Sequence, residues 1–374
     1  MPGWLLSTLA VLFTFGLVIF MHEAGHFLMC KKLGIRVIRF AFGFGPELFG
    51  ITYGGTRFSL CAVPLGGYVK PAGESLEDCT GHPDEYFSRS PWERLAMVAA
   101  GPSMNYVLAF FLFTGVVFVH GMPEPSNEPV IGELAMGFPA EQAGLKPGDR
   151  ILSVDQVEVA TWEELASVIH RSADKKVALE LRRAEKLERA SVTPKFDSSL
   201  GHGLIGIKPQ MVYARLSLLA SAKEGVHQCW FWTAYTVKTL WEKIYRRERP
   251  DLAGPVGIVQ MVSKAAHSGA EDFVFLLALL SVAIGFFNLL PIPLLDGGHA
   301  VLYLWEGISR RKLTLKTLAV ANSIGLALLF SILIFATYND ILRIREGRRT
   351  KAEKAAPEEQ APAPKAPKTP VPAQ

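Results

Sequence analysis

Charged residues are scarce in this chain. Only 20% of its 374 residues are Asp, Glu, Lys or Arg, whereas 49% are hydrophobic and the mean hydropathy is +0.23. Soluble proteins carry about 25% charged residues, so this balance excludes a chain that is mainly disordered and favours apolar surface placed in lipid. The net charge is only +4, and the basic residues are spread along the chain without a patch. Nucleic acid is therefore not expected as a partner.

Paired cysteines are also missing. The four cysteines are Cys30, Cys61, Cys79 and Cys229, and no two of them form a CxxC motif. This spacing predicts neither a disulfide framework nor a thiolate metal site. We expect reduced thiols.

Long uncharged stretches, in contrast, occur four times, at residues 4–21, 95–119, 273–295 and 318–338. A helix of about 20 apolar residues crosses the hydrocarbon core of a bilayer. The first stretch lacks the basic start and the small-residue cleavage site of a signal peptide, so we interpret it as a retained span. The sequence predicts a membrane protein with four transmembrane helices.

Basic residues predict the orientation of these spans. Eight lie between spans one and two, and four lie between spans three and four. The positive-inside rule places both loops in the cytoplasm and residues 120–272 outside. The basic residues that follow span four, taken alone, would instead place the C-terminus inside.

The outside region contains a predicted small α+β domain. Residues 130–134, 150–154 and 176–182 resemble strands, and residues 161–172 form an amphipathic helical stretch. A second helical stretch at 216–245 mixes Trp and Tyr with Lys and Arg. It either lies in the membrane interface or packs on the soluble domain. Residues 346–374 are rich in Ala, Pro, Glu and Lys, which predicts disorder.

Ionisable residues interrupt the end of the first span. His22 and His26 are four residues apart, so in a helix they share one face and can bind one metal ion. Glu23 follows the first histidine, as in zinc peptidases with a His-Glu-x-x-His motif, where this glutamate takes a proton from the metal-bound water. Ionisable groups inside a span are expensive and usually functional. Ligand chemistry favours zinc, with Fe²⁺ as an alternative.

A third ligand is needed for such a site, and Asp296 is the candidate. It is the first charge after 23 uncharged residues, and the predicted topology brings it to the depth of the two histidines. Pro291 and Pro293 break helix geometry beside it, which membrane proteins tolerate next to a polar cavity. Asn288 either hydrogen-bonds substrate or bonds a neighbouring helix.

These motifs together resemble the site-2 protease family, and more narrowly its bacterial RseP-type members. The resemblance covers about residues 1–345 and rests on His22-Glu23-x-x-His26, on Asn288-x-x-Pro291-x-Pro293-x-Leu295-Asp296-Gly297, and on the inserted soluble domain. It implies an intramembrane zinc metalloendopeptidase of a bacterial inner membrane that cleaves single-pass membrane proteins during regulated intramembrane proteolysis. Anti-sigma factors and remnant signal peptides are the implied substrate classes.

The resemblance also implies residue roles. His22, His26 and Asp296 would bind Zn²⁺, and Glu23 would be catalytic. Substrate-binding roles fall on Asn288, Pro293, Asn105 in Gly101-Pro102-x-x-Asn105, and a membrane-reentrant β-hairpin that contains Gly66, Gly67 and Tyr68. The run Ala143-Gly144-Leu145-x-x-Gly148-Asp149 resembles a PDZ domain. The interval has room for one such domain, where many relatives carry two, and no specific PDZ ligand or gating partner is implied.

The expected fold class is a polytopic α-helical membrane protein with about four transmembrane helices, a membrane-reentrant β-hairpin and an inserted α+β PDZ domain. The expected parts are spans one and two with the hairpin (1–120, hairpin about 55–72), the periplasmic PDZ domain (125–198), a linker with an interfacial helix (199–260), spans three and four with the Leu-Asp-Gly motif (261–345), and a disordered tail (346–374).

Three other functions are weighed against the protease. A catalytically silent PDZ membrane scaffold would be suggested by substitution of Glu23 or Asp296, and neither is substituted. A transporter with an intramembrane metal site often shows internal repeats, which this sequence lacks. A secreted soluble zinc peptidase fails because its motif would lie inside the apolar segment.

Overall fold

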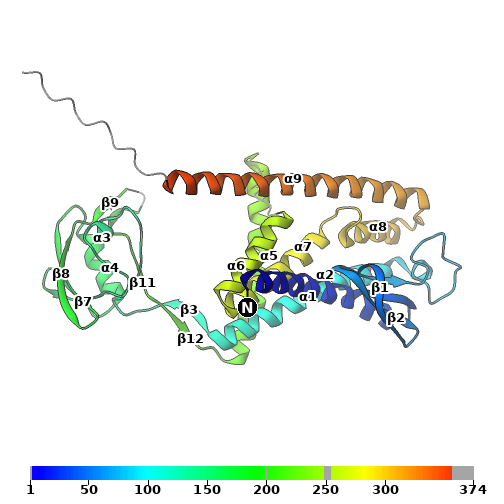
Figure 1. Ribbon diagram of the computed structural model, residues 1–374, viewed down its shortest axis with the longest axis horizontal. Coiled ribbons are helices and arrows are strands. Elements are labelled where there is room, and N and C mark those ends of the chain that lie inside the picture. Colours follow the sequence, from blue (N-terminus) through cyan, green and yellow to red (C-terminus); the bar gives the residue numbers. More distant parts are fainter. Residues whose placement is uncertain (1, 199, 248–253, 356–374) are drawn as a thin grey trace, which may run out of the picture. The chain divides into compact units, whose positions relative to one another are not determined.

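The computed structural model describes residues 2–198, 200–247 and 254–355 (Figure 1). The described residues divide into two compact units. One lies within Met1–Leu112 and His227–Gln374, and the other is Phe113–Val226. The first unit is built around apolar helices, and the second is an α+β domain.

Four helices are long and apolar enough to cross a membrane: α1 (Gly3–Lys32), α2 (Pro91–His120), α7 (Ala270–Leu289) and the first part of α9 (Leu315–Ala355). The four predicted spans are confirmed as helices. The third ends at Leu289 and not at residue 295, because Pro291 and Pro293 lack the N–H group that a continuing helix needs.

The end of α9 corrects the predicted disorder of the tail. The helix continues to Ala355, so residues 346–355 are helical, consistent with their Lys, Glu and Ala content. The remainder of the predicted disordered segment, residues 356–374, lies outside the described residues.

Helices α1 and α2 approach closely at Gly25. A Cβ atom at this position would lie 2.3 Å from the carbonyl oxygen of Ala100, so only glycine permits this contact. Nearby, Val18, Leu108 and Leu277 form a buried cluster that joins α1 and α2 to α7. The two helices that carry the site are therefore held together by direct backbone contact and by apolar packing.

A β-sheet follows α1 and consists of β1 (Val37–Tyr53) and β2 (Thr56–Pro71). The turn between them is Gly54-Gly55, and both residues have positive φ (+55° and +75°), as two-residue hairpin loops require. Residues 39–42 pair with 67–70 and also with 57–60, so they are central, and residues 67–71 form an edge. The predicted hairpin at about 55–72 covered only β2 and missed β1.

Three short elements complete the helical unit: η1 (Tyr86–Ser88), α6 (Pro255–Ser268) and α8 (Asp296–Ser309). A core of Cys30, Ile35, Val37, Tyr86 and Tyr303 packs α8 against the end of α1 and the start of the sheet. Between α6 and α9, the buried carboxylate of Asp340 accepts hydrogen bonds from the backbone N–H groups of Gly254 and Gly257. These contacts hold the helix ends in place.

The second unit is the predicted α+β domain. Its four-stranded sheet has the order β6-β5-β7-β8 (Val157–Glu158, Arg150–Val154, Val177–Arg183, Lys186–Val192). Helix α4 (Trp162–Arg171) starts at a capping box formed by Thr161 and Glu164, and α3 spans Pro139–Gln142. The strands and helix predicted at 130–182 match β4, β5, β7 and α4.

Short antiparallel pairs extend this domain beyond its predicted end. Strand β4 (Ile131–Leu134) pairs with β11 (Ile207–Pro209), β3 (Met122–Pro125) with β12 (Met211–Ala214), and β9 (Lys195–Asp197) with β10 (His202–Leu204). The predicted boundary at 198 is therefore too early. Residues 202–214 belong to the domain and not to a linker, because they pair with its first strands.

Helix α5 (Leu218–Tyr245) matches the predicted helix at 216–245. The Thr233 hydroxyl lies 3.0 Å from the Tyr106 hydroxyl on α2, and the Trp232 ring packs on Phe275 of α7. On the remaining surface Trp230 and Trp241 are 72% and 68% exposed. An apolar aromatic surface beside spanning helices suits the membrane interface.

Candidate metal centre and peptidase site

Three ligand atoms from two distant segments meet at one point. His22 Nε2 lies 3.2 Å from His26 Nε2 and 3.0 Å from Asp296 Oδ2, and His26 Nε2 lies 3.5 Å from the same oxygen. Both histidines project from one face of α1, and Asp296 is the first residue of α8. Among the described residues these three form the one group with metal-ligand geometry.

The geometry fits zinc. Ligands about 2.0–2.1 Å from a tetrahedral zinc ion are about 3.3 Å apart, and the three separations given above bracket this value. Two imidazoles and one carboxylate also match the ligand set of catalytic zinc sites, which leave one position for water. In a protein without metal these atoms would be three acceptors or protonated groups crowded together, so the donor set favours a bound cation.

Close packing delivers Asp296 to this point. Cβ atoms at Gly297 and Gly298 would lie 2.3 Å from the carbonyl oxygens of Leu289 and Ile292. The two glycines therefore let the start of α8 fold back onto the end of α7. Leu294, in the turn before Asp296, has a φ of +80°, which is strained for a residue other than glycine.

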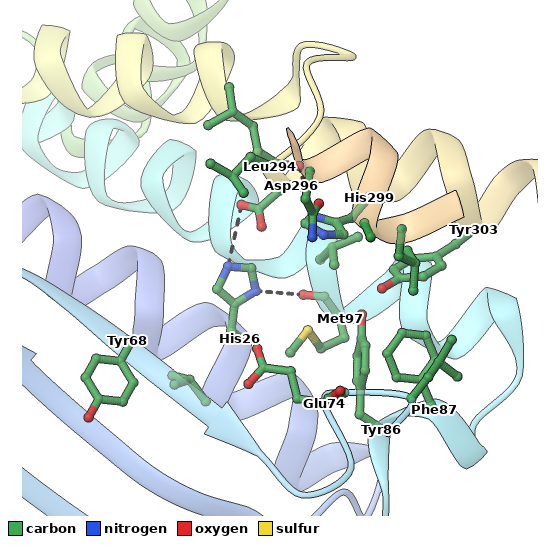
Figure 2. A pocket seen from close by; sticks show the side chains of 18 of the residues that line it. His26, Tyr68, Glu74, Tyr86, Phe87, Met97, Leu294, Asp296, His299 and Tyr303 are labelled. Carbon is green, nitrogen blue, oxygen red and sulfur yellow. Dashed lines mark hydrogen bonds and ion pairs between the residues drawn. The ribbon is translucent and has the colours of Figure 1, made fainter. Parts of the chain in front are cut away.

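Helix α2 supports the two histidines from behind. The Nδ1–H group of His26 donates to the carbonyl oxygen of Met97 at 2.9 Å, which leaves Nε2 free for the metal (Figure 2). The Asn105 side chain lies 3.3 Å from Nδ1 of His22. Between them is Gly101, where a Cβ atom would lie 2.3 Å from His26 Nε2.

Glu23 lies on the other side of the site, beside the sheet. Its Oε2 accepts a hydrogen bond from the backbone N–H of Val69 at 3.1 Å. Val69 belongs to the edge segment of β2, and Gly67 in the same segment lies beside Glu23, since a Cβ there would be in van der Waals contact with Glu23 Cγ at 3.4 Å. The edge strand and the glutamate are thus held next to each other.

The site opens into a cavity of about 790 Å³. His22, Glu23, His26 and Asp296 line it, together with Tyr68 of the edge segment and Asn288 at the end of α7. Figure 2 shows Tyr68, Glu74 and His299 around the histidine and the aspartate. Burial raises the pKa of the Glu74 carboxyl group, which Lys70 opposes. The cavity is large enough for a peptide segment.

The structure separates the predicted substrate-binding residues into two groups. Asn288, Tyr68 and the neighbouring Gly67 lie at or beside the cavity. Asn105 is fully buried, contacts His22 and is not among the residues that line the cavity, so its predicted contact with substrate stays a prediction.

Gly66 and Pro293, also predicted to bind substrate, are not among the residues that line the cavity. Gly66 is covered by the Phe44 ring, 2.1 Å from where its Cβ would be, and its φ of +147° favours glycine. Pro293 packs against Gly325 of α9, where a Cβ would lie 2.1 Å from the Pro293 oxygen. Both residues are thus packed against neighbouring parts of the chain, and their predicted contact with substrate stays a prediction.

Sequence reasoning missed the support from α2. Met97, Gly101 and Asn105 are spaced by four residues and so form one stripe of the helix. The sequence shows this stripe, but only the register of α2 against α1 shows that it faces His26 and His22.

Known proteins resemble the chain along most of its length. The family model described as "Peptidase family M50" matches residues 10–332. A protein of Clostridium acetobutylicum named a "putative zinc metalloprotease" is 33% identical, over 88% of this chain and 95% of its own length. Relatives with the same description from Mesorhizobium japonicum and Agrobacterium fabrum are each 34% identical, over 88% and 91% of this chain and 97% and 96% of their own.

Solved PDZ domains are similar to part of the chain. The PDZ domain of an SdrC-like protein from Listeria monocytogenes is 22% identical, covers 23% of this chain and 90% of that domain, and has a TM-score of 0.20. A corresponding domain from Listeria innocua is also 22% identical, covers 24% of this chain and all of that domain, and has a TM-score of 0.21. The α+β architecture of the second unit is assigned from its own strands and helices, described above.

The family match over residues 10–332 and the full-length relatives agree with the spanning helices and with the His22, His26 and Asp296 cluster. The chain belongs to peptidase family M50, the site-2 proteases, and is a zinc metalloprotease of the membrane.

Proposed function

We propose that this protein hydrolyses a peptide bond within or near the transmembrane segment of single-pass membrane proteins, with His22, His26 and Asp296 as zinc ligands and Glu23 as the catalytic base. One observation carries the proposal: the cluster of ligand atoms lies inside the helical unit, with two ligands on the apolar helix α1. A substrate must therefore reach the site at membrane depth. A helix in lipid satisfies all its backbone groups internally, so it must unwind before cleavage.

The edge of the sheet offers partners for an unwound segment. Residues 67–71 pair with β1 on one side only, so their other edge can accept a substrate strand. The Val69 N–H group donates to Glu23, which supports the proposal because this edge lies next to the proposed catalytic base. Tyr68 lines the cavity, where it can contact a substrate side chain. Asn288 at the end of α7 also lines the cavity and can donate to the scissile carbonyl.

In the proposed reaction the metal ion and the residues of this chain have separate roles. Zinc polarises a carbonyl group and makes water a nucleophile near neutral pH. Glu23 takes the proton from the attacking water and delivers it to the leaving amine. The Val69 N–H group orients the Glu23 carboxylate through its hydrogen bond.

The α+β domain is proposed to be a PDZ domain on the periplasmic side of a bacterial inner membrane, with the active site toward the cytoplasm. The positive-inside rule supports this orientation. A single domain in this place can screen or dock a substrate that has already lost its outer part. Substrates of this kind include anti-sigma factors and remnant signal peptides.

The test is cleavage of a tagged single-span reporter in liposomes by the wild type and by His22→Ala, with the cleavage position mapped by mass spectrometry. We expect wild-type cleavage at a bond inside or beside the span and none by the variant. A soluble unfolded protein serves as the matched substrate. Cleavage of the soluble substrate alone would contradict an intramembrane activity, and zinc binding with no cleavage of any span would favour the silent scaffold.

A further inference from the structure

The hydrogen-bond partner of His22 differs from that of His26. His26 donates from Nδ1 to a backbone oxygen, that of Met97. This fixes the ring with its proton on Nδ1 and its lone pair on Nε2, toward the metal. His22 has no such backbone partner among the described residues. The group 3.3 Å from its Nδ1 is the side-chain amide of Asn105.

Asn105 is held rigidly in this position. It is 0% exposed, its backbone oxygen accepts a 2.8 Å hydrogen bond from the Ser281 hydroxyl on α7, and Gly285 packs against its Cβ atom, which would lie 3.2 Å from a Cβ at position 285. The amide oxygen has no hydrogen-bond partner among the described residues, whereas the amide nitrogen faces His22. A buried polar atom without a partner costs about 1–3 kcal/mol.

The orientation of the amide decides which ring nitrogen of His22 can bind metal. If the amide nitrogen donates to Nδ1, the ring proton is on Nε2 and blocks the ligand atom. A half-turn of the amide exchanges its nitrogen and oxygen without changing its shape. The oxygen then accepts the proton of Nδ1, and Nε2 presents its lone pair to the metal. Either orientation leaves one amide atom without a hydrogen-bond partner. The contact with His22 therefore decides which orientation the amide adopts.

We infer that Asn105 is the positioning residue for His22: its amide oxygen accepts the Nδ1 proton and so keeps Nε2 aimed at the zinc ion. This inference rests on the proposed ligand role of His22. It assigns to α2 the support of both histidines, through Met97 for His26 and through Asn105 for His22. The side chain touches neither the substrate cavity nor the metal, so it acts only through the ring.

The test measures zinc affinity and not proteolysis. The full chain carries Glu23→Gln in every sample, so that no substrate is turned over, and each protein is titrated with zinc against a competing chelator. Asn105→Leu keeps the approximate volume but cannot accept a hydrogen bond, whereas Asn105→Asp keeps an acceptor oxygen. Ser103→Ala is the matched control, because its side chain is exposed on the same helix and its hydroxyl donates to the carbonyl oxygen of Ala99.

We expect Asn105→Leu to weaken zinc binding by about 10- to 100-fold, the usual effect of losing the partner of a ligating histidine. Asn105→Asp and Ser103→Ala should bind zinc as the parent does. Cobalt(II) in place of zinc should give a tetrahedral absorption spectrum in the parent and in Asn105→Asp, and an altered one in Asn105→Leu. Thermal unfolding of the metal-free proteins shows whether a loss of affinity comes from damage to the fold.

Parent-like affinity and spectrum in Asn105→Leu would overturn the inference. So would an Asn105→Asp protein as weak as Asn105→Leu, because an acceptor would then not matter and the residue would only fill space. A parent that binds no zinc would instead overturn the metal centre itself, which separates the two failures.

Discussion

At the scale of single residues, the metal centre depends on the lack of a side chain at Gly101. The hydrogen of Gly101 faces both ligand rings: a Cβ atom would lie 2.3 Å from His26 Nε2 and 2.9 Å from His22 Cε1. Both contacts are shorter than real Cβ atoms show. The rings cannot move away freely, because Met97 and Asn105 hold their other nitrogens.

Gly101→Ala should therefore displace the ligands and weaken zinc binding by about tenfold or more, the range found when ligand orientation is lost. Gly115→Ala on the same helix is the control, since nothing lies within 4 Å of its Cβ position. That change should leave zinc affinity unaltered and stabilise the helix by about 0.5–1 kcal/mol. Competitive zinc titration of both variants measures the difference. Equal affinities would contradict the crowding at position 101.

Asp149 makes a second prediction, in the α+β domain. It is 1% exposed and accepts 2.8 Å hydrogen bonds from both Nε and Nη2 of Arg183 and from the Lys146 N–H group. Burial alone would raise the pKa of Asp149, but these bonds outweigh it and the pKa lies below its ordinary value. The carboxylate thus adds stability above the unfolded-state pKa of about 4, which is lost as the pH falls further.

The free energy of unfolding of this domain should accordingly fall as the pH drops from about 5 toward 2. The amide of an Asp149→Asn variant cannot titrate, so that variant should be less stable at pH 7 and should show a shallower fall. Urea unfolding can be followed by the ¹⁹F signal of fluorotryptophan at position 162, the one tryptophan of this unit. Parallel pH curves for the two proteins would contradict the role of Asp149.

At the scale of secondary-structure elements, a buried ion pair joins the start of α2 to α8. Arg94 Nη2 lies 2.9 Å from Glu306 Oε1, and the side chains are 3% and 10% exposed. The guanidinium group also lies over the rings of Phe87 and Tyr303, 5.1 and 4.7 Å from their centroids. Because α8 begins with Asp296, this pair anchors the helix that carries the third ligand.

Removal of one partner leaves a buried charge alone and costs about 3–5 kcal/mol. Arg94→Met and Glu306→Leu should each lower the thermal unfolding midpoint strongly in detergent. The double variant should recover much of the loss, since two apolar side chains can replace a buried pair. A double-mutant cycle on the unfolding midpoints tests this. Strictly additive losses would show that the pair is not coupled.

The elements differ in how well the sequence predicts them. Helix α4 is bounded by a capping box at Thr161, and the spans are long apolar runs, so local signals suffice. Strand β1 was missed although Phe40, Phe42 and Phe44 alternate with small residues, which is a strand period. The contacts of Gly101 and Asn105 depend on the register between two helices, which no local pattern encodes.

At the scale of the whole molecule, the orientation in the membrane follows from the distribution of basic residues. We expect the loop that contains Cys79 to face the cytoplasm and the α+β domain to face the periplasm. Cys79 is half-buried, whereas Cys30, Cys61 and Cys229 are buried. Glu185, in the turn between β7 and β8, is exposed and suits a reporter cysteine.

In intact cells a membrane-impermeant thiol reagent should label Glu185→Cys, and it should label Cys79 only after the inner membrane is opened. Labelling of Glu185→Cys in a Cys79→Ser background separates the signal of position 185 from that of Cys79. Labelling of Cys79 in intact cells, with protection at position 185, would reverse the proposed orientation.

The central claim is that Glu23 performs chemistry at a zinc ion held by His22, His26 and Asp296. The most direct measurement compares wild type with Glu23→Gln for zinc content and for cleavage of a single-span reporter in the same liposomes. The account predicts about one zinc ion per chain in both proteins and cleavage by the wild type alone. Cleavage by Glu23→Gln at the wild-type rate, or loss of zinc from that variant, would contradict the claim.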